Sequence, residues 1–312
     1  MVARDADEAR ELERQIAFRA SLGLRATRVR ASHARELEPA LAPTIRLALE
    51  LPDDHSVDPR RLLASLRGVC LSAGVELREH ARVRRVLAGG AAVSGVELQG
   101  GERVLAPAVV IAAGTGSVDV GGLPRDAAAP VRPVKGQILR LRDPAGSGLV
   151  HRAIRFEGGY LVPRADGCYV LGATVEERGF DLQPTAGAVY QLLRDCHELV
   201  PGVSELEIEE LCVGLRPGTP DNLPVIGPGA IDGLLWATGH YRNGILLAPL
   251  TAELIVGVLT GSSPADDPLL AACAPSRFSA SAGSAEPALT AAAHDARPAA
   301  KPVEDSRAAV RL

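Results

Sequence analysis

A short polar turn near residue 240 is the part of this sequence best suited to chemistry. It lies between an apolar segment typical of a buried strand and a longer apolar segment typical of a helix. The first turn of a helix carries unsatisfied N–H groups and about half a positive charge, which stabilise negative charge on a ligand. Such a turn also serves simply to reverse the chain, and geometry alone leaves both interpretations open. The turn and the start of the helix comprise Gly239, His240, Tyr241, Arg242, Asn243, Gly244, Ile245 and Leu246.

The charge and the cysteines narrow the class of ligand. The 34 basic and 38 acidic residues are mixed along the 312-residue chain, so there is no basic face for nucleic acid and no polybasic membrane patch. The five cysteines include no C-x-x-C pair, which indicates neither a disulfide framework nor a metal site. The longest apolar stretch, Ile245 to Thr260, is interrupted by Pro249 and Glu253. We expect a cytoplasmic protein without a membrane span that binds a small molecule.

Hydrophobic periodicity predicts the elements of the first half. Apolar residues at helical spacing run from Asp7 to Leu22. Asp58 and Pro59 have the residue types of an N-cap and a first helical position, and the helix they begin ends near Gly74. The continuous apolar run from Val109 to Ala113 predicts a strand buried on both faces. Short strands are predicted at 75–77, 83–87, 96–98 and 103–105.

The second half contains a different pattern followed by a return to the first. From Pro130 to Cys212, strands of period two surround one helix, Thr185 to Leu199, which predicts a separate domain with a mixed sheet. The chain then forms a buried strand from Leu234 to Thr238 and a helix from Gly244 to about Leu259. Helices that alternate with buried strands are typical of an open nucleotide-binding sheet, so the predicted fold class is α/β.

The amino-acid sequences of five segments resemble one protein family, and this resemblance favours one ligand for the turn. Residues 239–249 read G-H-Y-R-N-G-I-L-L-A-P, which resembles, nearly letter for letter, the segment that contacts the isoalloxazine ring in the glycine oxidase family of FAD-dependent oxidoreductases. Four further segments are similar to that family in the same order, and the resemblance extends from about Asp7 to Gly261. It implies that FAD is the cofactor. The four segments are 131–138, 160–163, 172–174 and 214–227.

The resemblance implies roles for three residues at the substrate. Arg216 would pair bidentately with the substrate carboxylate, for which a planar guanidinium is suited, and Arg242 would be a second cation near the carboxylate and the flavin. Tyr160 would line the pocket and add a hydrogen bond. Without the resemblance, the alternative for Arg216 is a surface charge, and the alternative for Arg242 is an ion pair that stabilises the turn. The alternative for Tyr160 is a core residue. Val175 and Gly158 stand where some relatives have methionine and histidine, so pocket size and substrate choice stay open.

The resemblance also implies the contacts to FAD. The backbone of Val83 would meet the adenine, and Ala112, Ala113 and Gly114 would end a strand that packs close to the cofactor, where glycine permits close approach. A buried strand that needs no ligand is the alternative for Ala112. No protein base is required, because a neutral amine can donate hydride directly when it is held in line with the flavin. We therefore predict no catalytic side chain. The implied flavin contacts are His240, Tyr241, Arg242, Asn243, Gly244, Ile245 and Leu246.

One family motif does not occur in the sequence. The family begins with a βαβ unit whose G-x-G-x-x-G places the pyrophosphate on a helix N-terminus, and neither Gly114-Thr115-Gly116 nor Gly121-Gly122 continues into that pattern. A start codon assigned too late, a decayed fragment and a partner chain that supplies the unit are the three explanations. We favour the first, because a decayed gene would be expected to lose residues such as Arg216 and Arg242.

The expected organisation is an incomplete Rossmann-like FAD-binding domain and a mixed-sheet substrate domain. Residues from 262 on are rich in Ala, Ser and Pro without an apolar period, which predicts disorder. The five parts are a helical segment attached to the substrate domain (1–57), the first part of the FAD-binding domain (58–129), the substrate-binding domain (130–213), the C-terminal part of the FAD-binding domain (214–261) and the tail (262–312).

The resemblance implies an oxidoreductase that acts on glycine or another small amino acid. Hydride transfer to FAD would give the imino acid, which hydrolyses to the oxo acid and ammonia, and oxygen would be reduced to hydrogen peroxide. A role in thiamine biosynthesis is also implied, because the imine supplies the thiazole ring. A D-amino acid or sarcosine oxidase or dehydrogenase of the same superfamily is one alternative, and an inactive fragment unable to hold FAD is another. Oligomeric state stays open, with a homo-oligomer among the alternatives.

Overall fold

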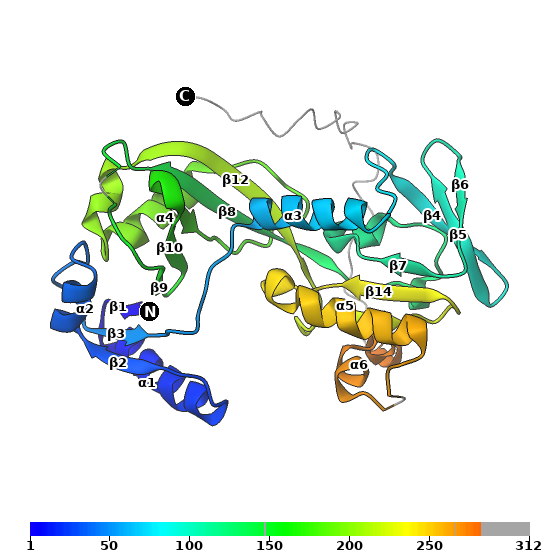
Figure 1. Ribbon diagram of the computed structural model, residues 1–312, viewed down its shortest axis with the longest axis horizontal. Coiled ribbons are helices and arrows are strands. Elements are labelled where there is room, and N and C mark those ends of the chain that lie inside the picture. Colours follow the sequence, from blue (N-terminus) through cyan, green and yellow to red (C-terminus); the bar gives the residue numbers. More distant parts are fainter. Residues whose placement is uncertain (147, 265, 282–312) are drawn as a thin grey trace.

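The computed structural model describes residues 1–146, 148–264 and 266–281, which form two bodies joined by long strands (Figure 1). The first body is built on a five-stranded sheet with the order β12-β8-β11-β10-β9. Its ladders are all antiparallel, so the expected mixed sheet is wrong for this body. β9, β10 and β11 follow one another through short hairpins, which make their pairings antiparallel. Its strands are β8 (Arg132–Arg142), β9 (Ile154–Phe156), β10 (Gly159–Pro163), β11 (Cys168–Gly172) and β12 (Glu207–Gly218).

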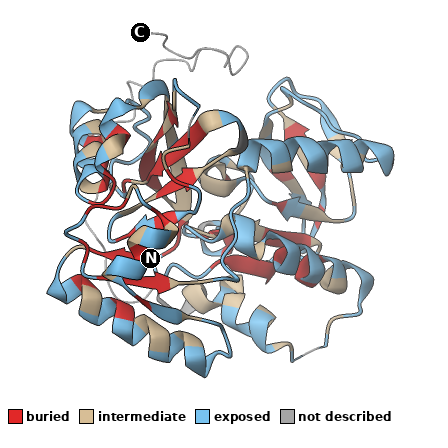
Figure 2. Ribbon diagram, turned by 60° about the vertical axis from the view of Figure 1, so that its left-hand side comes forward, coloured by how far each residue is buried: buried red, intermediate tan, exposed pale blue. Residues whose placement is uncertain are grey.

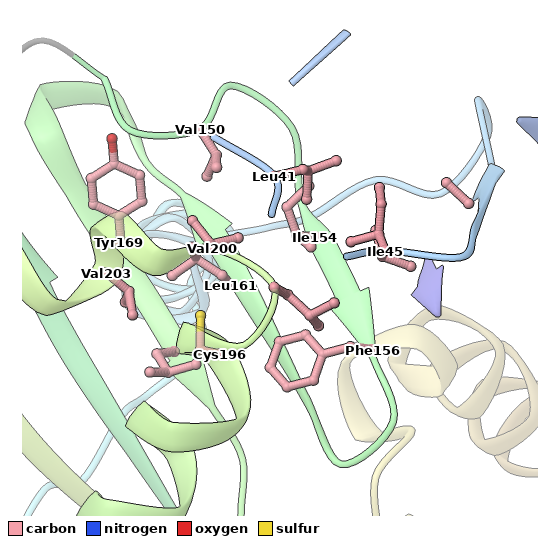
Figure 3. Packing of buried hydrophobic residues seen from close by; sticks show 14 of the residues in the cluster. Leu41, Ile45, Val150, Ile154, Phe156, Leu161, Tyr169, Cys196, Val200 and Val203 are labelled. Carbon is pink, nitrogen blue, oxygen red and sulfur yellow. The ribbon is translucent and has the colours of Figure 1, made fainter. Parts of the chain in front are cut away.

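One face of this sheet forms the main core. Side chains alternate between the two faces of a strand, so leucines two residues apart, such as Leu139 and Leu141, point to the same side. Both are fully buried, as is Leu161 on β10. The helix α4 (Ala186–His197) contributes Leu192 to the same buried cluster, and Figure 3 shows another part of it, with Leu161 beside Val200 of the loop that follows α4. The opposite face of the sheet is left for the site.

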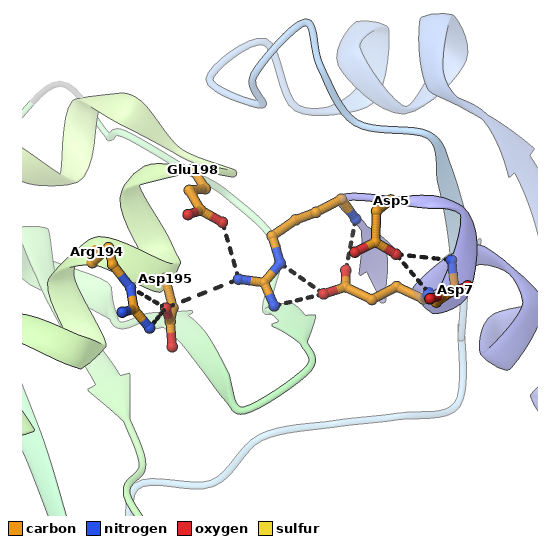
Figure 4. A network of polar contacts seen from close by, with 7 residues as sticks. Asp5, Asp7, Arg194, Asp195 and Glu198 are labelled. Atoms are coloured by element: carbon orange, nitrogen blue, oxygen red, sulfur yellow. Dashed lines mark hydrogen bonds and ion pairs between the residues drawn. The ribbon is translucent and has the colours of Figure 1, made fainter.

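The first 57 residues pack against this core through a small sheet that the sequence did not predict. Val29 and Leu41 belong to the same buried cluster as Leu161. Arg4 pairs with Glu8 and reaches across to Glu198 after α4 (Figure 4). The strands are too short to show a period in the sequence. The elements are β1 (Val2–Ala3), α1 (Ala6–Ser21), β2 (Thr27–Arg30), α2 (Ala31–Leu37) and β3 (Leu47–Glu50), with the sheet order β1-β3-β2.

The second body contains the parallel strand pair that the α/β prediction requires. β7 and β14 run parallel, and β13 pairs with β14 on its other side. A separate antiparallel sheet, β4-β5-β6, stands beside them (Figure 1). The elements are α3 (Pro59–Ser72), β4 (Val83–Gly89), β5 (Ala92–Leu98), β6 (Arg103–Leu105), β7 (Val109–Ile111), β13 (Val225–Pro228), β14 (Leu234–Thr238), α5 (Gly244–Thr260) and α6 (Pro268–Cys273). The short 3-10 helices are η1 (Gly114–Asp119), η2 (Arg125–Ala127), η3 (Ala165–Gly167), η4 (Pro201–Glu205) and η5 (Pro275–Ser281).

The helix α3 begins as predicted but leaves its apolar residues in water. Asp58 caps the helix by accepting hydrogen bonds from the backbone N–H groups of Arg60 and Arg61. None of its residues is buried, and Val69 is 65% exposed (Figure 2). On β7, Val110 is also exposed, so the prediction of a strand buried on both faces is wrong, because the described residues leave the face that carries Val110 uncovered.

The expected tail begins later than the composition indicates. α6 and η5 are formed, so the prediction of disorder is wrong for residues 268–281. Arg277 donates to Asp221 over 2.8 Å, and Phe278 packs against the buried cluster around Trp236. The Arg277–Asp221 ion pair and the ring of Phe278 thus hold residues 275–281 against the second body, although the composition of this segment is typical of a linker. Residues 282–312 of the predicted tail lie outside the described residues.

Apolar side chains that stay exposed in the folded chain lose little when they are truncated. We predict that Leu63→Ala and Val69→Ala on α3 change the free energy of unfolding of this chain by at most about 0.5 kcal/mol. Leu192→Ala on α4, which empties a buried position of another amphipathic helix, should cost about 2–5 kcal/mol. Urea unfolding of the three variants measures this, and a loss of about 2 kcal/mol on α3 would mean that its apolar face is packed in solution.

Candidate functional site

Tyr160 and Arg216 lie on the uncovered face of the large sheet. Across the strands, Tyr160 of β10 is opposite Gly172 of β11, which is opposite Ile138 of β8, so the three residues share one face. A methyl group at Gly172 would lie 2.7 Å from the hydroxyl oxygen of Tyr160, which shows that the phenol ring crosses directly above this glycine. On β12, Cys212 is paired with Ile138. Arg216 lies four positions further along the same strand, so it occupies the same face.

The guanidinium of Arg216 is half-buried and has no carboxylate partner among the described residues. Its Nη1 donates to the carbonyl oxygen of Thr174 over 2.9 Å and to that of Lys135 over 3.4 Å. Burial lowers the pKa of Arg216, and the nearby Arg242 lowers it further, while Tyr160 acts in the opposite direction. An arginine keeps its charge under such conditions, so the site holds a positive charge without a counterion. Its chemistry is that of an anion receptor.

A buried polar network fixes the carbonyl group to which Arg216 donates. The backbone N–H of Gln137 donates to Thr174 Oγ1 over 2.9 Å, and Thr174 Oγ1 donates to Glu176 over 2.5 Å. The amide of Gln137 also donates to Glu176, over 2.8 Å, and the fully buried Lys135 pairs with Asp181 over 2.8 Å. The loop that contains Thr174 is thereby held on the strand β8.

This network was not predicted, although the sequence contains a signal for it. Lys135 and Gln137 continue the inward-facing series of Leu139 and Leu141 on one strand. Polar side chains at core positions must be hydrogen-bonded, so they indicate a specific buried partner. Their pattern predicts that a partner exists without naming it.

The turn before α5 lies against the end of β12. The backbone N–H of Tyr241 donates to the carbonyl oxygen of Pro217 over 2.9 Å, and Tyr241 has a left-handed φ of 50°. His240 is hydrogen-bonded to Thr251 on α5 over 2.9 Å, and burial lowers the pKa of its imidazole. These contacts place the turn beside Arg216, to which Tyr241 and Arg242 are electrostatically coupled.

The start of α5 fits one end of a flat heteroaromatic cofactor. The side chain of Asn243 makes no capping hydrogen bond, so the first N–H groups of this 17-residue helix stay available. Ile245 and Leu246 stand beside them with 50% and 77% of their surface exposed. Free donors next to exposed apolar side chains match a ring with a polar edge and apolar faces. The ends of β7 and β14 meet close by, where Thr238 Oγ1 donates to the carbonyl oxygen of Gly114 over 3.2 Å.

The structure therefore brings together most of the residues that the sequence predicted. Arg216 and Tyr160 converge with Tyr241 and Arg242 at the boundary between the two bodies. Arg242 is exposed, its guanidinium lies 5.1 Å from the centre of the Tyr241 ring, and no carboxylate pairs with it in the described ranges. Val83 belongs to the separate sheet, as the first residue of β4, paired with Leu98. The ligand roles of all these residues stay predictions.

Among the described residues, no three His, Cys, Asp or Glu side chains gather as potential metal ligands. No helix in these ranges combines the length and the apolar composition needed to cross a membrane.

Comparison with known proteins places this geometry in context. Residues 1–257 match the family model described as FAD dependent oxidoreductase. The chain is 39% identical over 230 residues to the bifunctional protein ThiO/ThiG of Synechocystis sp., covering 73% of this chain and 34% of that protein. It is 35% identical over 242 residues to the glycine oxidase of Pseudomonas putida, covering 76% of this chain and 64% of that protein. The chain thus spans less than two thirds of the length of these relatives.

A solved structure shows the same fold. The crystal structure of glycine oxidase from Geobacillus kaustophilus superposes with a TM-score of 0.81 at 33% identity, covering 88% of this chain and 73% of that chain. Crystalline L-proline dehydrogenase from P. horikoshii superposes with a TM-score of 0.78 at 22% identity, which shows the fold alone. The match to glycine oxidase confirms the predicted fold class.

The half-buried imidazole of His240 gives a prediction for pH dependence. Because burial lowers the pKa of His240 from 6.5, the unfolded chain binds the proton more tightly than the folded chain. The free energy of unfolding should therefore keep its full value above pH 6.5 and should decrease as the pH drops below 6.5. His240→Asn should flatten this dependence in urea unfolding between about pH 5 and pH 7.5. A ring titration of His240, followed by NMR, with a midpoint at or above 6.5 would contradict the assignment.

Proposed function

Because the chain belongs to the family of FAD dependent oxidoreductases, as a member of the glycine oxidase type, we propose that its protein oxidises a small amino acid with FAD. The observation that supports this most is the uncompensated charge of Arg216 between Tyr160 and the turn before α5. A charge of that kind suits the carboxylate that all amino acids share.

Each group in the site has a task that its chemistry allows. Arg216 binds the carboxylate through a guanidinium fork, and the hydroxyl of Tyr160 donates a further hydrogen bond to it. Arg242 adds positive charge at the mouth of the site. The N–H groups at the start of α5, the residues 240–246 and the backbone of Val83 would hold FAD, and bound FAD would supply the hydride acceptor for the carbon that bears the amine. No side chain has to remove a proton, since the substrate amine reacts in its neutral form.

We assign glycine as the preferred substrate. The amino acid becomes an imino acid, which water converts to the oxo acid and ammonia, and oxygen is reduced to hydrogen peroxide. The similarity to ThiO/ThiG supports a supply of the imine to the thiazole branch of thiamine biosynthesis. We assign residues 130–213 to the substrate and residues 58–129 and 214–261 to FAD, and we place the protein in the cytoplasm.

Peroxide release from glycine, sarcosine and D-alanine tests the proposal on the protein supplied with FAD. Glycine should be the best of the three, and a preference for one of the others would support the alternative oxidases. A protein that fails to bind FAD at all would support the inactive fragment. Binding of FAD without peroxide release or reduction of the flavin by any of the three would contradict the proposed activity.

Removal of the carboxylate fork should act mainly on substrate binding. A bidentate charged hydrogen bond is worth about 1.5–3 kcal/mol, so Arg216→Ala should raise KM for glycine about 10- to 100-fold. Tyr160→Phe should raise it a few-fold. Arg142→Ala on the same sheet removes an exposed arginine that pairs with Glu209 and should leave KM unchanged. An unchanged KM in Arg216→Ala, measured by peroxide release over a range of glycine concentrations, would remove Arg216 from the site.

A further inference from the structure

A glycine lies directly beneath the guanidinium of Arg216. An ideal Cβ atom on Gly136 would stand 2.6 Å from Cζ of Arg216 and 2.5 Å from its Nη2. Real Cβ atoms do not approach other atoms so closely, so the arginine takes its observed position only because this residue has no side chain. The backbone at Gly136 does not have the left-handed φ that favours glycine. The three atoms nearest to such a Cβ all belong to Arg216, so the demand for glycine at this position that the structure shows is space for this side chain.

The strand partner of Gly136 provides a natural comparison. Gly214 of β12 is directly opposite Gly136 of β8 in the same sheet. An ideal Cβ on Gly214 would meet nothing within 4 Å. The two residues share secondary structure and register, and they differ in whether a side chain would touch Arg216.

The contact determines which edge of the guanidinium faces a ligand. With the group lying flat over Gly136, Nη1 reaches the carbonyl oxygens of Thr174 and Lys135. Nε and Nη2 have no acceptor within the part of the chain that the structure describes. These two nitrogens carry N–H bonds that point in parallel, which matches the two oxygens of one carboxylate.

We propose that Gly136 is a positioning residue, which lets the guanidinium of Arg216 lie on the strand β8 so that its Nε and Nη2 edge receives the carboxylate. The inference rests on the proposed function and adds the orientation of the fork and the residue that sets it. A side chain at position 136 lifts Arg216 from the strand and separates Nη1 from Thr174. Because the displaced group is the end of a flexible side chain, the fold tolerates the change while the fork loses its place.

Acetate and acetamide are suitable probes, because they have nearly the same shape and differ in charge. The dissociation constants of both, measured by calorimetric titration of the full 312-residue chain, define its preference for the anion. Gly136→Ala should weaken acetate binding about tenfold or more, in line with loss of a charged hydrogen-bond pair, and should leave acetamide binding unchanged. Gly214→Ala should keep the acetate affinity of the original chain within about twofold.

The outcomes separate the inference from the proposed function. If the original chain does not prefer acetate to acetamide, or if Arg216→Ala keeps that preference, the carboxylate site itself is wrong. If the original chain prefers acetate and Gly136→Ala binds it as tightly as Gly214→Ala does, the positioning role is overturned and the carboxylate site stands.

A double variant keeps the test decisive if Gly136→Ala does not fold. With the guanidinium removed, Gly136→Ala has nothing to displace, so Gly136→Ala combined with Arg216→Ala should melt at the temperature of Arg216→Ala alone. A double variant that also fails to fold would show that Gly136 has a general structural role, and the proposal would be wrong.

Discussion

Withdrawing a guanidinium from water costs free energy that hydrogen bonds or an opposite charge must offset. In this protein Arg216 receives two backbone carbonyl oxygens and no carboxylate among the described residues. The deficit is partial, because Arg216 is only half-buried and water still reaches it. A bound carboxylate would offset the remaining desolvation cost of the Arg216 guanidinium. Two acidic groups that follow Thr174 in the chain, Glu176 and Asp181, are already engaged by Gln137 and Lys135.

The same sheet serves as core and as site because its two faces differ in composition. On the α4 side, leucines fill the central rows, and Lys135 and Gln137 replace them where the loop with Thr174 must be held. On the other side, Gly136 and Gly172 leave room for the side chains of neighbouring strands to lie flat. The long strands β8 and β12 carry this surface to the boundary with the second body, where the turn before α5 meets Pro217.

Local signals in the sequence were sufficient for the long helices, but the 12-residue strand β12 was not predicted. The cap at Asp58 with Pro59 gave the start of α3, and period two gave the central strands of the large sheet. The resemblance to glycine oxidase, rather than spacing, brought Tyr160 and Arg216 to one site. The small sheet β1-β3-β2 was missed because strands of two to four residues show no period. The role of Gly136 was not predictable, since it depends on the register between β8 and β12, which no local pattern specifies.

The central claim is that Arg216 lies on the strand β8 with one edge open to an anion. The most direct test is a crystal structure of this chain, determined from crystals grown in saturating acetate. We expect both oxygens of one acetate on Nε and Nη2 of Arg216, with Nη1 still donating to the carbonyl oxygen of Thr174. An Arg216 turned away from Gly136 to pair with a protein carboxylate, or acetate bound only elsewhere, would contradict it.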